Sequence, residues 1–162
     1  MSTGSNDQNG RLIIINGIVQ GVGFRPTVYR YAQDAGLCGD VRNSTRGVVI
    51  RVFGTTQKID QFIRDLIQHP PMMARIDNIE QQTIPWQAVE SFSIVESEES
   101  SSSFLPVSPD LATCSACRAD ILDPANRRYQ YPFTNCTRCG PRFTILKTIP
   151  YDRKNTSMSG FK

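Results

Sequence analysis

A loop that can bind an anion is predicted at residues 17–26, GIVQGVGFRP, where an apolar run ends. Gly21 and Gly23 permit positive φ angles and close approach of a ligand to the backbone. Pro26 suits the first position of a helix, whose amides and positive dipole end would face the same point. The predicted phosphate-binding residues are Gln20, Gly21, Val22, Gly23, Phe24 and Arg25.

Arg25 is the side chain that we expect to bind the anion. A guanidinium presents a planar fork of donors that can hold two phosphoryl oxygens at once, whereas a lysine is a point charge. The alternative is a glycine-rich turn with Arg25 in a surface salt bridge. The order of strand, glycines, arginine and helix start favours the phosphate site.

A metal site is predicted from four of the five cysteines. Cys114 and Cys117 form one Cys-x-x-Cys pair, and Cys136 and Cys139 form another after eighteen intervening residues. Two such pairs are typical of a closed, tetrahedral zinc site with a structural role. A redox dithiol is the alternative, but that motif occurs singly and beside a βαβ unit. We therefore expect Zn²⁺ as the cofactor, and Cys38 as a buried strand residue.

Composition limits the remaining possibilities. The 162 residues carry a net charge of +3, and residues 104–162 hold nine basic and four acidic side chains. No apolar run approaches the length of a membrane span, and the polar N-terminus lacks the pattern of a signal peptide. These features predict a cytoplasmic protein without a membrane partner, in which reduced cysteines suit metal ligation.

The apolar periodicity of the first 95 residues predicts an α+β fold. Strands are expected at 11–19, 37–43, 47–53, 76–84 and 92–95, with helices after Pro26 and over 59–67. The order βαββαβ with a short extra strand is that of the ferredoxin-like arrangement, in which two helices cover one face of an antiparallel sheet. The second helix carries the clearest apolar stripe: Ile59, Phe62, Ile63, Leu66 and Ile67.

Four segments are expected along the chain. A disordered tail at 1–10 precedes a domain at 11–95, an acidic serine-rich linker at 96–109 and a zinc segment at 110–162. In the zinc segment, Tyr129, Tyr131 and Phe133 can form only a miniature core, so metal binding is expected to supply most of its folding free energy. We expect Met72 and Met73 to pack under the loop after the second helix.

Residues 11–95 resemble the acylphosphatases. The resemblance rests on Gly17 to Arg25 and on the sequence GDVRN at 39–43, followed by Gly47-Val48. It implies that the loop arginine, Arg25, binds the substrate phosphoryl group and that Asn43 positions the attacking water. From the residues alone, Asn43 could equally serve ordinary turn chemistry. An acyl phosphate has a good leaving group, so positioning and charge stabilisation can suffice for its hydrolysis.

The chain as a whole resembles the hydrogenase-maturation carbamoyltransferases. Residues 110–153, with both cysteine pairs and the segment CGPRFT at 139–144, are similar to the first zinc-finger segment of that family. Asp40, where small acylphosphatases usually have an aromatic residue, also agrees. The resemblance implies carbamoyl phosphate as the acyl phosphate, hydrogenase-maturation proteins as partners, and a chain that is an N-terminal fragment or truncated relative.

A binding module is the rival interpretation. The basic excess and the aromatics of 104–162 could bind nucleic acid or protein, with a first domain that is purely structural. The arginines do not form a continuous run, which argues against nucleic acid. We therefore predict binding and hydrolysis of an acyl phosphate, most specifically carbamoyl phosphate.

Overall fold

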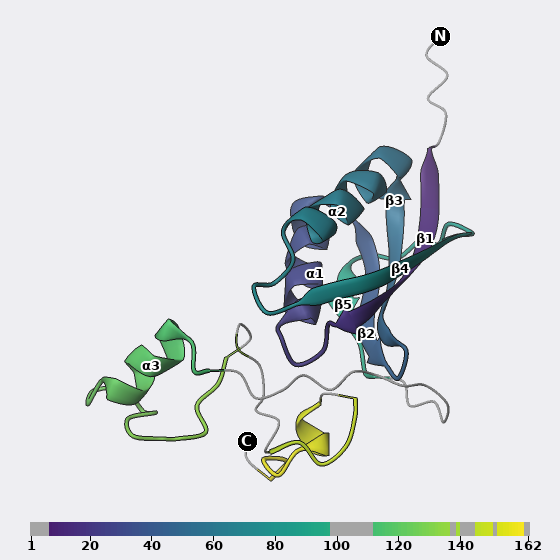
Figure 1. Cartoon of the computed structure of the whole chain (residues 1–162). Helices are drawn as coiled ribbons and strands as arrows, with labels where there is room; N and C mark the ends of the chain where they lie inside the picture. The colour runs from purple at the N-terminus through teal and green to yellow at the C-terminus, as the bar shows by residue number, and fades with distance from the viewer. Residues whose placement is uncertain (1–6, 98–111, 137–138, 140–144, 151, 161–162) are drawn as a thin grey trace.

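The computed structural model describes residues 7–97, 112–136, 139, 145–150 and 152–160 (Figure 1). The predicted linker and part of the zinc segment therefore lie largely outside the described residues. We call residues 7–97 the sheet domain and the described residues from 112 onward the cysteine module. None of the helices in these ranges is long and apolar enough to cross a membrane.

The sheet domain contains five strands and two helices in the predicted order. The five strands form one sheet in the order β4-β1-β3-β2-β5, in which β5 alone runs parallel to its neighbour, β2. The prediction of a ferredoxin-like fold is confirmed. Its elements are β1 (Gln8–Ile18), α1 (Phe24–Asp34), β2 (Cys38–Ser44), β3 (Gly47–Thr55), α2 (Thr56–Gln68), β4 (Arg75–Ile84) and β5 (Phe92–Ile94).

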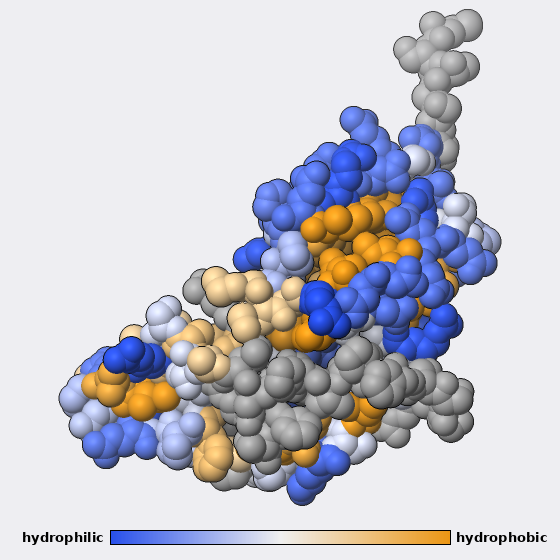
Figure 2. Space-filling model, viewed as in Figure 1, coloured by the Kyte–Doolittle hydropathy of each residue, from blue (hydrophilic) through white to orange (hydrophobic). Residues whose placement is uncertain are grey.

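Both helices pack on one face of the sheet (Figure 1), because alternate residues of the central strands turn their apolar side chains to that face. Ile13 and Ile15 of β1 are fully buried there, and apolar atoms reach the surface between α2 and β4 (Figure 2). Four of the five stripe residues of α2 are buried, but Ile67 is 49% exposed. At 100° per residue, Ile67 lies about 80° from Ile59, at the margin of the buried stripe.

Several boundaries differ from the sequence prediction. β1 begins at Gln8 because Gln8–Gly10 continue the ladder with β3, and backbone pairing requires no apolar side chain. α1 begins at Phe24, so Pro26 is its third residue rather than its first. A proline fits there too, because the first turn of a helix has no acceptors for its N–H groups. β4 is an edge strand whose residues are mostly exposed, which explains its weak apolar alternation.

The cysteine module contains little regular structure. It includes α3 (Ser115–Leu122) and the short 3₁₀ helix η2 (Arg153–Asn155). Tyr131 and Phe133 make an edge-to-face contact with ring centroids 6.0 Å apart, but Tyr129 and Phe133 are nearly half exposed. The expected aromatic core is therefore barely formed, and the module depends on other interactions for its stability.

Candidate functional site

The predicted anion loop lies between β1 and α1 at one end of the sheet. Gly21 and Gly23 have φ angles of 72° and 77°, in the left-handed region that the sequence prediction required of them. Gly23 is the N-cap of α1 and has no side chain to accept from the first N–H groups of the helix. Val22 and Phe24 are buried in the core, so they can contribute only backbone groups to the loop.

Gln20 holds this loop against the turn between β2 and β3. Its side chain is buried, and its Nε2 donates to the carbonyl oxygens of Ser44 and Gly47, both at 2.8 Å. The nitrogen of this amide is therefore used within the protein, and any contact of residue 20 with phosphate would involve its backbone. Because Ser44 follows Asn43, the tie brings the loop beside the predicted water-positioning residue.

Asn43 is 1% exposed, and its Oδ1 has no hydrogen-bond partner among the described residues. It is on β2, two residues after the fully buried Val41, and therefore on the face that the helices cover. An unsatisfied buried acceptor costs about 1–3 kcal/mol, and such groups are usually satisfied by water or a ligand. The position of this oxygen suits an acceptor for a bound water.

Arg25 is in the first turn of α1 and reaches the cysteine module. Its Nη2 lies 2.9 Å from Oδ1 of Asp152, and the two side chains are only 22% and 18% exposed. The alternative of a salt-bridged arginine is thus realised, although the pair is partly buried rather than on the open surface. The sequence analysis did not predict Asp152 as a site residue. The one feature that could have indicated it is that residues 104–162 contain few carboxylates.

Asp40 forms a separate ion-pair cluster. Its carboxylate is buried and accepts from Nε of Arg51 at 2.8 Å, directly across the β2–β3 ladder, and from Nη1 of Arg42 at 3.4 Å. The residue precedes Val41 on β2, so its side chain is on the sheet face opposite Asn43. The departure from the aromatic residue of small acylphosphatases is therefore accommodated by charge pairing within the sheet.

The four cysteines of the two Cys-x-x-Cys pairs come together as predicted. Their Sγ atoms all lie within 4.8 Å of one another, and two of the cross-pair distances are 3.5 Å from Cys114 to Cys136 and 3.8 Å from Cys117 to Cys139. A tetrahedral zinc site with Zn–S bonds of about 2.3 Å requires sulfur–sulfur separations of about 3.8 Å. The donor set therefore fits zinc, and Cys38 lies outside it.

The metal-free thiols differ in their ease of ionisation. A hydrogen bond from the backbone N–H of Cys117 lowers the pKa of Cys114 to about 7. Burial raises the pKa of Cys117 well above the usual value for a thiol. A cation at the centre of the cluster would favour the thiolate form of every ligand, since metal binding displaces the thiol protons.

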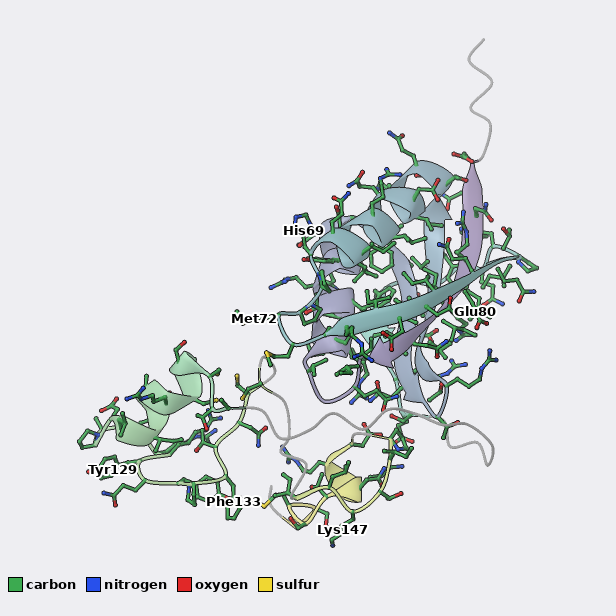
Figure 3. All side chains as sticks on the ribbon, in the orientation of Figure 1. His69, Met72, Glu80, Tyr129, Phe133 and Lys147 are labelled. Carbon is green, nitrogen blue, oxygen red and sulfur yellow. The ribbon has the colours of Figure 1, made fainter. Side chains whose placement is uncertain are left out.

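A cavity of about 600 Å³ lies between the sheet domain and the cysteine module. Its lining includes Gly23 and Pro26 near the loop, Cys114 and Cys139 of the four-cysteine cluster, and Met72. Met72 is 93% exposed, in the loop between α2 and β4 (Figure 3). The prediction that Met72 packs under its own loop is wrong, because the loop turns this side chain outward.

Comparison with known proteins agrees with this architecture. Residues 11–94 match the family model described as acylphosphatase, and an acylphosphatase of Aliivibrio fischeri is 38% identical over 86 residues, which cover 52% of this chain and 94% of that protein. The chain belongs to the acylphosphatase family. A solved acylphosphatase from Coxiella burnetii, 26% identical, superimposes with a TM-score of 0.53 and covers 59% of this chain and all of its own.

The similarity to carbamoyltransferases extends through the cysteine module. Residues 113–146 match the HypF finger model, and carbamoyltransferase HypF2 of Cupriavidus necator is 44% identical over 151 residues, 92% of this chain and 19% of that protein. A full-length HypF crystal structure in a phosphate- and nucleotide-bound form has a TM-score of 0.89 at 46% identity, covering 96% of this chain and 20% of its own. The chain spans about a fifth of the length of these relatives.

Proposed function

We propose that this chain binds an acyl phosphate at the loop of residues 20–25 and hydrolyses it, with carbamoyl phosphate as the substrate. The unsatisfied, buried Oδ1 of Asn43 beside the glycine loop is the observation that carries this proposal. Family membership supports an anion in the loop, and a HypF relative has been solved in a phosphate-bound form. In the longer HypF-type protein, the step would serve carbamoyl transfer in nickel–iron hydrogenase maturation, with maturation proteins as partners.

The chemistry follows from the two side chains and the backbone of the loop. Arg25 and the first amides of α1 would bind the phosphoryl oxygens and stabilise the charge that shifts among them. Oδ1 of Asn43 would accept a hydrogen bond from a water and aim it at phosphorus. The new P–O bond would form as the bond to the acyl oxygen breaks, giving inorganic phosphate, a carboxylate or carbamate, and a proton.

Zinc would have a structural role in this protein. We infer that Cys114, Cys117, Cys136 and Cys139 bind one Zn²⁺ as four thiolates, since their spacing fits that ion and four protein ligands leave no open position for chemistry. We also propose a cytoplasmic location, where a reducing environment would keep these thiolates available as ligands.

Substitutions at two positions, Arg25 and Asn43, test the assigned roles with benzoyl phosphate and carbamoyl phosphate as substrates. Arg25→Ala should lower both phosphate affinity and turnover, by about 10²–10³-fold in kcat/KM, because a charge-assisted contact to the phosphoryl group is lost. Arg25→Lys should restore little of the lost affinity and turnover, since a point charge cannot reproduce the bidentate contact of a guanidinium with two phosphoryl oxygens. Arg64→Ala is the matched control, because Arg64 is exposed on α2 and contacts Gln61.

Asn43→Ala should lower kcat about 10–100-fold and leave affinity for inorganic phosphate nearly unchanged, because only the water is misplaced. Its free energy of unfolding should stay within about 1 kcal/mol of the parent or rise, since the change removes an unsatisfied buried acceptor. Asn78→Ala on the exposed face of β4 is the control.

Parent-like hydrolysis by Arg25→Ala, or loss of phosphate binding by Asn43→Ala, would refute the roles. A salt-dependent shift on mixed DNA or RNA without hydrolysis would favour the rival binding function.

A further inference from the structure

Asp152 is directed to Arg25 by its own segment of the cysteine module. It is the N-cap residue of η2, where an aspartate ordinarily accepts from the N–H groups of its helix, yet its side chain makes no such cap hydrogen bond. Instead its Oδ1 lies 2.9 Å from Nη2 of Arg25. The carboxylate thus contacts the sheet domain instead of its own helix.

The backbone that carries Asp152 is held by a compact set of hydrogen bonds. The side chain of Asn155 is buried and donates to the carbonyl of Pro150 at 2.7 Å, while its backbone N–H donates to the carbonyl of Asp152 at 2.9 Å. The N–H of Asp152 donates to the same Pro150 carbonyl at 2.8 Å. A carboxylate on a backbone fixed in this way can orient its partner.

We propose that Asp152 is a positioning residue, which holds the Arg25 guanidinium in the orientation that binds the phosphoryl group. An arginine side chain has several rotatable bonds, and a partly buried ion pair restricts them before substrate arrives. A guanidinium carries five N–H donors, so a contact between one nitrogen and a carboxylate does not by itself use up the donors that phosphoryl oxygens require. The anion site would then be completed by the cysteine module. This inference rests on the proposed function.

The opposite arrangement, in which Asp152 blocks the site as a stand-in for substrate, makes the opposite prediction. Removing a blocking carboxylate would raise turnover and strengthen phosphate binding, because an anion that competes for Arg25 is gone. Removing a positioning carboxylate would lower turnover, because one contact that restricts the guanidinium to the binding orientation is lost. The sign of the change in kcat/KM therefore decides between the two arrangements.

The test uses the zinc-loaded full chain with benzoyl phosphate. Asp152→Ala should lower kcat/KM about tenfold, whereas Asp152→Asn, which keeps an oxygen acceptor at the same place, should retain at least half of the parent's kcat. Asp120→Ala is the matched control, because Asp120 forms an ion pair of equal length, 2.9 Å, with Arg128 inside the cysteine module. This control should leave kcat/KM within about twofold of the parent. Zinc content, measured on every variant, separates a positioning effect from unfolding of the module.

The outcomes separate the two proposals. Unchanged or increased kcat/KM in zinc-loaded Asp152→Ala would overturn the positioning role and leave the proposed function standing. An equal loss in Asp120→Ala, or an equal loss in Asp152→Asn, would also overturn it. A parent chain that neither hydrolyses benzoyl phosphate nor binds inorganic phosphate would instead overturn the proposed function, and the positioning role with it.

Discussion

Replacing Gln20 with Met should destabilise the sheet domain and detach the anion loop. Nε2 of Gln20 makes two buried hydrogen bonds of 2.8 Å, to the carbonyls of Ser44 and Gly47. Each such hydrogen bond contributes about 1 kcal/mol net to the free energy of unfolding. The two buried carbonyls left without a donor would add part of their desolvation penalty to the loss. Since Met has a similar shape and volume, packing changes little. We expect a loss of about 2–4 kcal/mol in the free energy of unfolding.

Urea unfolding of the zinc-loaded chain, followed by far-ultraviolet circular dichroism, measures this loss. Gln33→Met is the matched control, because Gln33 is exposed on α1 and its side chain donates to Tyr29 at the surface. It should change stability by less than about 0.5 kcal/mol. If Gln20→Met were also within about 0.5 kcal/mol of the parent, the amide could not be what ties the loop to the hairpin.

Gln20→Glu tests the same contacts through pH. A carboxylate has no donor for the two carbonyls, whereas a protonated carboxyl has one, so the pKa of this glutamate should be raised in the folded state. A folded-state pKa above the unfolded value, about 4.3, means that the native state binds more protons and loses stability as pH rises above that value. The deficit relative to the parent should therefore grow between pH 4 and pH 7. A deficit that shrinks over this range would contradict the assignment.

Three further predictions concern the metal and the core. Cys136→Ser should abolish stoichiometric zinc in elemental analysis, whereas Cys38→Ser should retain it; full zinc content in the first variant would contradict the ligand set. Chelation should unfold the cysteine module and leave the amide protection of β1 and β3 intact, so loss of that protection would show that the modules fold as one unit. Leu66→Ala should lower the free energy of unfolding in urea by about 2–4 kcal/mol, and Ile67→Ala should lower it by less than about 1 kcal/mol. Equal losses would contradict the assignment of the buried face of α2.

The elements that the sequence predicted are those whose signal is local. The stripe on α2 repeats at the helical period, and the glycines of the anion loop lie where positive φ angles are required. The spacing of the two Cys-x-x-Cys pairs predicts that the four cysteines lie together, because metal-ligand spacing is a short-range pattern in the sequence. The start of α1 was misplaced by two residues, since proline is compatible with several positions of the first turn.

The contacts that define the candidate site have no comparable signal. Gln20 is a neutral side chain in a glycine-rich loop, and its hydrogen bonds to residues 44 and 47 arise only when β1 and the hairpin share a sheet. The pairing of Arg25 with Asp152 depends on how two modules meet. The unsatisfied oxygen of Asn43 is a property of its burial, which no spacing in the sequence encodes.

The sulfur cluster also has a consequence for the chemistry of the protein after metal loss. Cys114 is half-buried, has a pKa of about 7 and lies 3.5 Å from the sulfur of Cys136. A thiolate that is accessible and adjacent to a second thiol is the form that oxidants convert to a disulfide through a sulfenic acid. A bound zinc ion would therefore act as a protecting group, and its removal in air would be followed by a covalent cross-link that prevents reloading.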